Sequence, residues 1–572
     1  MTALSLVAAS WVALLAPKAA LSTLAEQSGF TKTGRYEEVV RLCREFPRAY
    51  PKVKCATFGQ TPERRPMLAF TVGAKGKPTL VVQGGIHAGE IDGKDAGFLV
   101  LRELLEGKLA GVDLNKVRVV FVPVFNVDGH ERFGAHNRPN QIGPEESGWR
   151  VTAQNLNLNR DYVKAEAPEM RAMLALLGKE DPVIYMDLHV TDGAEFQHEI
   201  AFLVAPGASI ADAPAGLAAA AAALREKVRE SLAAEKHLPI VDFYPMFMKN
   251  DDPSGGFSAM ASTPRFSDAY WASRNRLAIL VETHSWKDYA TRVKATHDAV
   301  VAVLGELTLH GEEWRAAEKA AEAEPLAGRP LALGWRPDVS KPKPLEFLGY
   351  AYKRSPSAIS TVTRIQYDRT KPEVWRVPFY GVLIPTVTAT LPRAGWYVPR
   401  AFGDLVAAKL AVHGIVSHEV AAPKTMDVEA FRADDIKRRA ETFEGRPMVT
   451  VRGKWSKESR SFVAGGLFVP VGQPRARLAA QILEPEAPDS LVSWGYFNAV
   501  FEQKEYMEDY VLEDVAEKMM QDPAVKAEFE RRLKDPAFAK SPHERVDFFY
   551  RKHPSWDEQL DLVPIYRVAT PL

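Results

Sequence analysis

Continuous apolar runs in the first half of the chain predict strands that are buried on both faces of a sheet. Three such runs are rich in β-branched and aliphatic residues and span Thr79–Gln83, Val183–Leu188 and Leu277–Val281. Runs of this kind, in place of alternating apolar and polar residues, are typical of parallel strands. After the first run, residues 92–105 repeat apolar side chains at helical spacing, as a helix packed on a sheet does. The pattern predicts an α/β fold.

The second half of the chain has a different pattern. A charged, alanine-rich helical stretch ends at Pro325, which cannot continue a helix. Beyond it, segments such as Val449–Trp455 alternate β-branched and polar residues between Pro and Gly, as strands do. Two helical patterns, at residues 401–413 and 505–533, interrupt this region. We therefore expect an apolar N-terminal segment in residues 1–22, an α/β domain in residues 23–325 and a β-rich domain in residues 326–572.

Each of the three buried runs is followed by polar side chains that suit a metal site. His87 and Glu90 lie three residues apart in a glycine-rich turn after the first run, His189 ends the second run and Glu282 ends the third. Because the carboxyl ends of parallel strands meet at one edge of the sheet, we expect the four side chains to lie close together. Two histidines and one glutamate leave a tetrahedral position for water, which is the pattern of a catalytic zinc site. Glu282 is then the candidate base that takes a proton from that water.

Taken singly, each of these residues has a simpler explanation. His189 can cap a strand, and Glu90 can be a carboxylate that responds to the helix dipole. A His-x-x-Glu pair also occurs by accident in a long sequence. The metal-site hypothesis therefore depends on the whole set.

A second polar group lies between the first and second runs. Arg150 comes first, and Asn155, Asn157 and Asn159 then alternate along one face before Arg160. The planar guanidinium of arginine carries five donors and suits a carboxylate. The group therefore indicates a site for an anionic part of a substrate.

As an ordered set, these motifs resemble the zinc metallocarboxypeptidases of the carboxypeptidase A superfamily, of the bacterial type and with an extra C-terminal domain. The matching elements lie between residues 25 and 309 and are His87-x-x-Glu90, Asn126-Val127-Asp128-Gly129, Trp149-Arg150, Leu158-Asn159-Arg160, His189 and Glu282. The resemblance implies a mixed, mostly parallel sheet flanked by helices.

The resemblance also implies a role for each site residue. His87, Glu90 and His189 would hold one Zn²⁺ ion, and Glu282 would act as general base and then as general acid. Arg150 would polarise the scissile carbonyl and stabilise the oxyanion, because preorganised donors aimed at developing charge are usually the largest catalytic term. The pair Asn159 and Arg160 would bind the free α-carboxylate of a peptide, which makes such an enzyme an exopeptidase.

Two local differences from the digestive members of the family affect this prediction. Asn157 stands where those enzymes have an aspartate that orients the first zinc histidine, so we expect weaker metal binding, by about ten- to a hundredfold for such a partner. Residues 248–270 should hold the mobile tyrosine and the specificity pocket, but they do not align. Tyr270 and Phe257 are candidate substrate contacts there, although aromatic residues in such segments are more often packed in the core.

Two functions from different classes fit the sequence. The first is a zinc carboxypeptidase that removes C-terminal residues from peptides. The second is an aspartoacylase-like deacylase or amidohydrolase, in which the same metal and base cleave an N-acyl amino acid. A third hypothesis, a binding protein that retained only the fold, is disfavoured by the complete set of ligands, base and arginines.

Composition and charge exclude other partners. The chain has 572 residues, zero formal net charge and a pI of about 7.2, so no global electrostatic attraction to nucleic acid is expected. The first seventeen residues carry no charge and are mostly apolar, which suits a secretory signal and is too short for an integral membrane span. An apolar helix packed on the protein is the alternative. Oligomeric state is not predicted.

The two cysteines, Cys43 and Cys55, are close in sequence and flank a short Pro-containing connection. They can form one disulfide, which together with the apolar start predicts a periplasmic or extracellular location. Two free buried thiols in a cytoplasmic protein are the alternative.

Overall fold

The large sheet lies in the N-terminal half of the molecule. The computed structural model describes residues 21–207 and 212–572, so most of the predicted N-terminal segment lies outside the described residues. Within them the large sheet has eight strands, in the order β1-β2-β4-β3-β5-β9-β6-β7. The strands are β1 (Lys54–Gln60), β2 (Pro66–Val72), β3 (Thr79–Gly84), β4 (Arg118–Val122), β5 (Ile184–Val190), β6 (Ile200–Ala205), β7 (Pro239–Val241) and β9 (Leu277–Thr283).

The centre of this sheet is parallel and its flanks are mixed. Strands β4, β3, β5 and β9 run parallel to one another, whereas β2 pairs antiparallel with β4 and β6 pairs antiparallel with β9. Every residue of β3, β5 and β9 is buried, because both faces of the sheet are covered. The predicted mixed, mostly parallel sheet flanked by helices is therefore confirmed.

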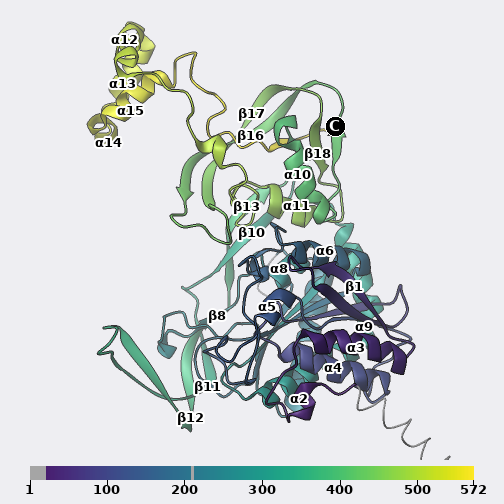
Figure 1. Ribbon diagram of the computed structural model, residues 1–572. Helices are drawn as coiled ribbons and strands as arrows, with labels where there is room; N and C mark the ends of the chain where they lie inside the picture. The colour runs from purple at the N-terminus through teal and green to yellow at the C-terminus, as the bar shows by residue number, and fades with distance from the viewer. Residues whose placement is uncertain (1–20, 208–211) are drawn as a thin grey trace, which may run out of the picture.

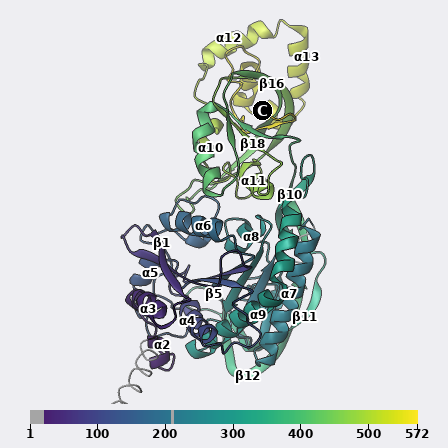
Figure 2. The ribbon, with the colours of Figure 1, turned by 90° about the vertical axis from the view of Figure 1, so that its right-hand side faces the viewer.

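Helices cover both faces of the sheet. The helices of this half are α2 (Leu24–Gln27), α3 (Tyr36–Ala49), α4 (Asp92–Leu105), α5 (Val127–Glu131), α6 (Pro168–Glu180), α7 (Ala215–Ala234), α8 (Ser267–Ala272) and α9 (Tyr289–Glu322). In two views at right angles, α6 and α8 lie on the side facing the C-terminal half, and α3 and α4 lie on the opposite side (Figures 1 and 2). None of the helices in the described ranges is long and apolar enough to cross a membrane.

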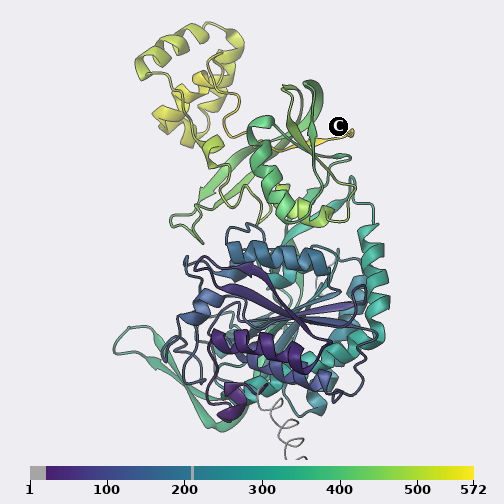
Figure 3. The ribbon, with the colours of Figure 1, turned by 45° about the vertical axis from the view of Figure 1, so that its right-hand side comes forward.

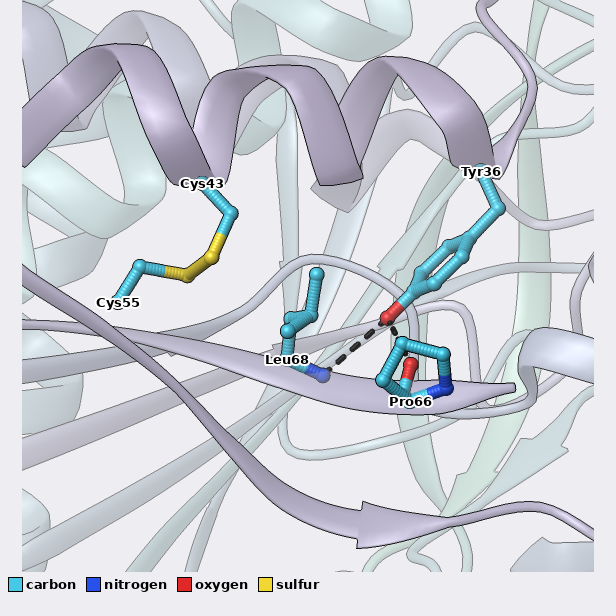
Figure 4. The surroundings of a disulfide bond; sticks show 5 residues. All are labelled: Tyr36, Cys43, Cys55, Pro66 and Leu68. Atoms are coloured by element: carbon cyan, nitrogen blue, oxygen red, sulfur yellow. Dashed lines mark hydrogen bonds between the residues drawn. A yellow bond between two sulfur atoms is a disulfide. The ribbon is translucent and has the colours of Figure 1, made fainter. Parts of the chain in front are cut away.

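A disulfide ties the outer helix α3 to the edge strand β1. Cys43 and Cys55 are bonded, with their Cα atoms 5.4 Å apart (Figure 4). Nearby, the hydroxyl of Tyr36 on α3 donates to the carbonyl of Pro66 at 2.7 Å and accepts from the N–H of Leu68 at 3.2 Å. The predicted pairing is confirmed, and the alternative of two free thiols is wrong.

The C-terminal half adds three smaller sheets, as the alternating sequence pattern predicts. They are β10 (Pro330–Pro337) with β13 (Leu383–Thr390); β11 (Lys343–Pro356), β12 (Thr363–Tyr380) and β8 (Phe257–Ser258); and β15 (His418–Val420), β18 (Gly466–Pro470), β14 (Gly395–Val398), β19 (Tyr566–Val568), β16 (Lys424–Arg438) and β17 (Val449–Phe462).

The helices of this half are α10 (Arg400–Val412), α11 (Ala476–Leu483), α12 (Asp509–Met519), α13 (Pro523–Arg532), α14 (Pro536–Lys540) and α15 (Pro542–Tyr550). The last four form a group at the far end of the molecule, coloured yellow in Figure 3.

The two halves of the chain share a hydrophobic core. One continuous cluster of buried apolar residues includes Leu188 of the large sheet as well as Trp396 and Trp494 of the C-terminal half. In addition, the long β11–β12 hairpin packs against the N-terminal half, where Phe347 contacts Phe257 with ring centroids 4.5 Å apart. The predicted boundary near residue 325 stays a prediction, since packing continues across it.

Candidate metal centre

A tight turn after β3 brings His87 and Glu90 to one side of the chain. Gly85 has a φ of +63°, which a residue with a side chain rarely adopts. The N–H of Glu90 then donates to the carbonyl of His87 at 2.9 Å. At Gly89, an added Cβ would lie 2.7 Å from the carbonyl oxygen of Gly148. The glycines therefore allow the turn to close against a neighbouring loop.

Three buried side chains converge at the carboxyl ends of β3 and β5. His87, Glu90 and His189 each offer one ligand atom, and these atoms lie within 4.8 Å of one another. Nδ1 of His87 lies 3.1 Å from Oε1 of Glu90, and Nδ1 of His189 lies 3.0 Å from Oε2 of Glu90. Although close to the carboxylate, Nδ1 of His87 makes no hydrogen bond with any described residue. Two imidazole nitrogens and a carboxylate oxygen fit a zinc ion, so these three residues form a site that can hold a metal.

The far side of each imidazole faces another polar side chain, through a hydrogen bond at His87 and an ion pair at His189. Nε2 of His87 lies 3.1 Å from Oδ1 of Asn157, and Nε2 of His189 lies 2.9 Å from Oδ2 of Asp187. Partners of this kind fix the tautomer of a ligating histidine and leave its other nitrogen for the metal. Asp187 is fixed in turn by Gln83, whose Nε2 donates to Oδ1 at 2.7 Å.

Charge around the cluster favours an ionised Glu90. Burial alone would raise its pKa, but the charges of His87 and Arg138 hold the pKa of Glu90 well below its usual range. For His189 burial opposes protonation, and the Asp187 carboxylate raises its pKa well above the ordinary value. The site is therefore built around anionic carboxylates that attract a cation.

Glu282 lies beside the cluster but is not one of its three ligands. In the parallel pair β5–β9, Glu282 is the register partner of His189, as the shared strand edge predicts. Its side chain is buried, and none of the described residues forms a hydrogen bond or ion pair with its carboxylate. Burial raises the pKa of Glu282 to about 8, despite the opposing charge of His189. An unpaired carboxylate in this place is available to exchange protons.

Two arginines reach the same carboxylate oxygen of the cluster. Nη1 of Arg150 and Nη1 of Arg138 each lie 3.1 Å from Oε1 of Glu90. The motif at residues 126–129 places Arg150, since Nδ2 of Asn126 donates to the carbonyl of Arg150 at 3.2 Å. The N–H of Trp149 likewise donates to the carbonyl of Gly129 at 2.7 Å. The sequence analysis missed Arg138, which lies in an irregular loop with no recognisable spacing.

Asn159 and Arg160 lie on a short 3₁₀ turn, Leu158–Arg160. Oδ1 of Asn159 accepts from the N–H of Ser267 at 3.4 Å. The guanidinium of Arg160 lies over the ring of Phe266 at 4.4 Å and donates to the carbonyl of Asn159 at 2.8 Å. No described carboxylate forms an ion pair with Arg160. Asn157 links the pair to the metal cluster, because its Oδ1 accepts from both His87 and the N–H of Asn159.

The aromatic candidates of residues 248–270 lie in the core. Tyr270 and Phe257 are both fully buried, and the hydroxyl of Tyr270 lies 3.0 Å from Nδ1 of His413. A different tyrosine, Tyr244, lies near Glu282. The hydroxyl of Tyr244 accepts from the N–H of Asp192 at 3.0 Å, and burial together with the charge of Glu282 raises the pKa of Tyr244. Tyr244 precedes residues 248–270, the segment in which the resemblance to the family placed the mobile tyrosine.

Comparison with known proteins agrees with this site. Residues 39–194 match the sequence profile of the zinc carboxypeptidase family. Over 111 residues, 19% of this chain, the sequence is 32% identical to carboxypeptidase 2 of Trichophyton rubrum, and the match spans only 20% of that protein.

Solved structures of similar proteins include two metallocarboxypeptidases. The metallo-carboxypeptidase of Burkholderia cenocepacia is 16% identical, with a TM-score of 0.35 over 48% of this chain and 69% of that one. Carboxypeptidase A of Helicoverpa armigera is 17% identical, with a TM-score of 0.36 over 50% of this chain and 75% of that one. The match to the zinc carboxypeptidase family thus covers residues 39–194, the part of the chain that carries His87, Glu90 and His189.

Proposed function

We propose that the protein is a zinc-dependent hydrolase that removes the C-terminal residue of a peptide. The observation that carries this proposal is the pairing of a His–Glu–His metal cluster with an unpaired guanidinium, Arg160, joined to it through Asn157. A half-buried arginine without a carboxylate partner is suited to bind a carboxylate from outside the protein. A free α-carboxylate is the group that marks the end of a peptide.

The chain's own residues divide the chemistry among them. His87, Glu90 and His189 would hold the zinc ion, which acts as a Lewis acid and lowers the pKa of a bound water. Glu282 takes the proton from the attacking water and later delivers it to the leaving amine. Arg150 donates to the oxygen on which negative charge develops.

Substrate orientation falls to the second polar group. Asn159 and Arg160 bind the terminal carboxylate, so that only the last peptide bond lies beside Glu282. Holding the substrate at one end raises the effective concentration of the reacting groups. The substrate is thus selected by its free C-terminal carboxylate, whatever the side chain of its last residue.

We also propose a periplasmic or extracellular location. The support is the disulfide between Cys43 and Cys55, because such bonds form and persist in oxidising compartments.

The test of the function is product identification. Zinc-loaded protein is incubated with a mixed peptide library and, separately, with a panel of N-acyl amino acids, and the products are identified by mass. Loss of single C-terminal residues, abolished by a chelator and restored by zinc, supports the proposal. Release of acyl groups without peptide trimming would instead identify an aspartoacylase-like deacylase.

A further inference from the structure

A turn of the C-terminal half reaches the segment that carries Asn157. Phe443 and Arg446 exchange two backbone hydrogen bonds, of 2.9 and 3.0 Å, around the two-residue turn Glu444-Gly445. Both turn residues have positive φ, +50° at Glu444 and +75° at Gly445. This is the pattern of a type I′ turn, which prefers asparagine or glycine at both positions. A glutamate at the first position is therefore unexpected.

The backbone of Glu444 is strained for its residue type. A side chain in the left-handed region costs about 1 kcal/mol or more, and such strain is retained where the surroundings require it. Here the carboxylate makes a specific contact: Oε2 of Glu444 accepts from the backbone N–H of Asn157 at 2.8 Å.

Asn157 connects this turn to His87, one of the proposed metal ligands. Its Oδ1 accepts from the backbone N–H of Asn159 at 2.9 Å and lies 3.1 Å from Nε2 of His87. Because a backbone N–H can only donate, it fixes the orientation of the Asn157 amide. The same amide oxygen then accepts from the metal ligand, so the position of Asn157 is transmitted to His87.

Further contacts hold the turn on this segment. The guanidinium of Arg446 forms an ion pair with Glu166, which also accepts from the hydroxyl of Tyr496 at 2.9 Å. On the other side, Nε and the backbone N–H of Arg265 donate to Asp489 at 2.6 and 2.8 Å. The C-terminal half thus contacts the N-terminal half at Glu166 and at Arg265, in addition to the contact of Glu444 with Asn157.

We propose that Glu444 is a positioning residue, through which the C-terminal half holds Asn157 and thereby sets His87 for metal binding. This inference rests on the proposed function, because it assigns the extra half of the chain to the same site. Among the described residues, Glu444 forms no hydrogen bond or ion pair with the metal cluster or the substrate-binding pair, although its charge opposes the lowering of the pKa of Arg160 by burial.

The test uses the full-length protein and three variants. Glu444→Gly removes the carboxylate and relieves the strained φ, so its melting temperature should equal or exceed that of the wild type. Glu444→Gln retains an oxygen that can accept from Asn157. Glu441→Gln changes an exposed carboxylate three residues earlier and is the matched control.

Two quantities are measured for each protein. One is the zinc dissociation constant, by competition with a chelating dye. The other is hydrogen–deuterium exchange of the segment 155–161 in zinc-depleted protein. In Glu444→Gly we expect zinc binding to weaken about tenfold, as for a lost partner of a metal ligand, and exchange of the segment to accelerate about tenfold. Glu444→Gln should lose less, and the control should not change.

The proposal is overturned if exchange in Glu444→Gly stays within twofold of the wild type, or if exchange accelerates while zinc affinity is unchanged. A wild-type protein that binds no zinc would refute the proposed function instead, and the exchange measurement alone would then decide the role of Glu444. A change in the glycine variant together with a melting temperature no lower than that of the wild type supports positioning, because general loss of stability cannot explain it.

Discussion

Replacing Arg160 by alanine tests whether the enzyme recognises the end of its substrate. Arg160 lies over Phe266 at 4.4 Å and has no carboxylate partner among the described residues, so substitution breaks no ion pair of the protein. Because the substitution does remove the hydrogen bond to the carbonyl of Asn159 at 2.8 Å, the loss is assigned to the substrate by comparing two forms of one peptide. Arg160→Lys is the informative companion, because lysine retains the charge but lacks the planar pair of donors.

The size of the effect follows from the surroundings of the guanidinium. Each hydrogen bond to a charged group contributes about 1.5–3 kcal/mol, and a bidentate pair would contribute two of them. Arg160 is partly exposed, so we take the lower value for each bond and expect a total of about 3 kcal/mol. At about 1.4 kcal/mol per factor of ten, kcat/KM should fall about a hundredfold. The lysine variant should lose about tenfold.

The assay compares two versions of one N-blocked peptide, with a free and with an amidated C-terminus. The alanine variant should lose about a hundredfold on the free acid and less than about threefold on the amide, which cannot form the same charged pair. Arg364→Ala, an exposed arginine on β12, is the control and should behave like the wild type. Equal losses on both peptides would refute the assignment of Arg160 to the terminal carboxylate.

Three other variants, one of them a double substitution, test the remaining chemistry and the stability of the fold. Glu282→Gln should lower turnover by at least about 10²- to 10⁴-fold, as expected for a lost general base, while zinc stays bound in a metal analysis; near-normal turnover would contradict its role. Replacing Cys43 and Cys55 by serine removes a cross-link between residues 12 apart in sequence and should lower the free energy of unfolding by about 3 kcal/mol, measured in urea; an unchanged midpoint would show that the thiols are not bonded. Glu318 is buried beside Arg276, and burial raises its pKa to about 9. Because the folded pKa exceeds that of the unfolded chain, its stability contribution is complete below about pH 4.5 and is lost up to about pH 9, by at most about 1.4 kcal/mol per pH unit. Glu318→Gln should therefore be more stable than the wild type at pH 8 and equal to it at pH 4. If urea unfolding gives both proteins the same pH dependence of stability, the raised pKa of Glu318 is refuted.

The sequence was most informative where strands are buried on both faces. Continuous apolar runs identify such strands, and their carboxyl ends meet at one edge, which is why His87, Glu90 and His189 could be brought together before the fold was known. The register of β5 and β9 places Glu282 beside His189 by the same logic. Asp187 was also within reach, since it precedes His189 by two residues on one strand and so shares its face.

Contacts made by loops were not predictable in this way. Arg138 reaches Glu90 from an irregular segment, and Glu444 reaches Asn157 across 287 residues. Such pairs depend on how distant loops fold back onto the sheet. The periodic spacing of apolar residues predicts helices and strands, but it carries no information about contacts between loops. The same limit applies to the β11–β12 hairpin: its alternating pattern indicates strands, but not that Phe347 would pack on Phe257 of the other half.

The core shared by the two halves has a consequence for how the chain can be divided. Tyr270 is fully buried and forms a hydrogen bond with His413. Phe257 is also fully buried, and its ring packs against the ring of Phe347. A protein ending near residue 325 would present both aromatic surfaces to water, and exposed patches of that kind promote aggregation. The first 325 residues alone are therefore a poor choice for expression, and the second half cannot be exchanged for an unrelated one without rebuilding the surface beneath it.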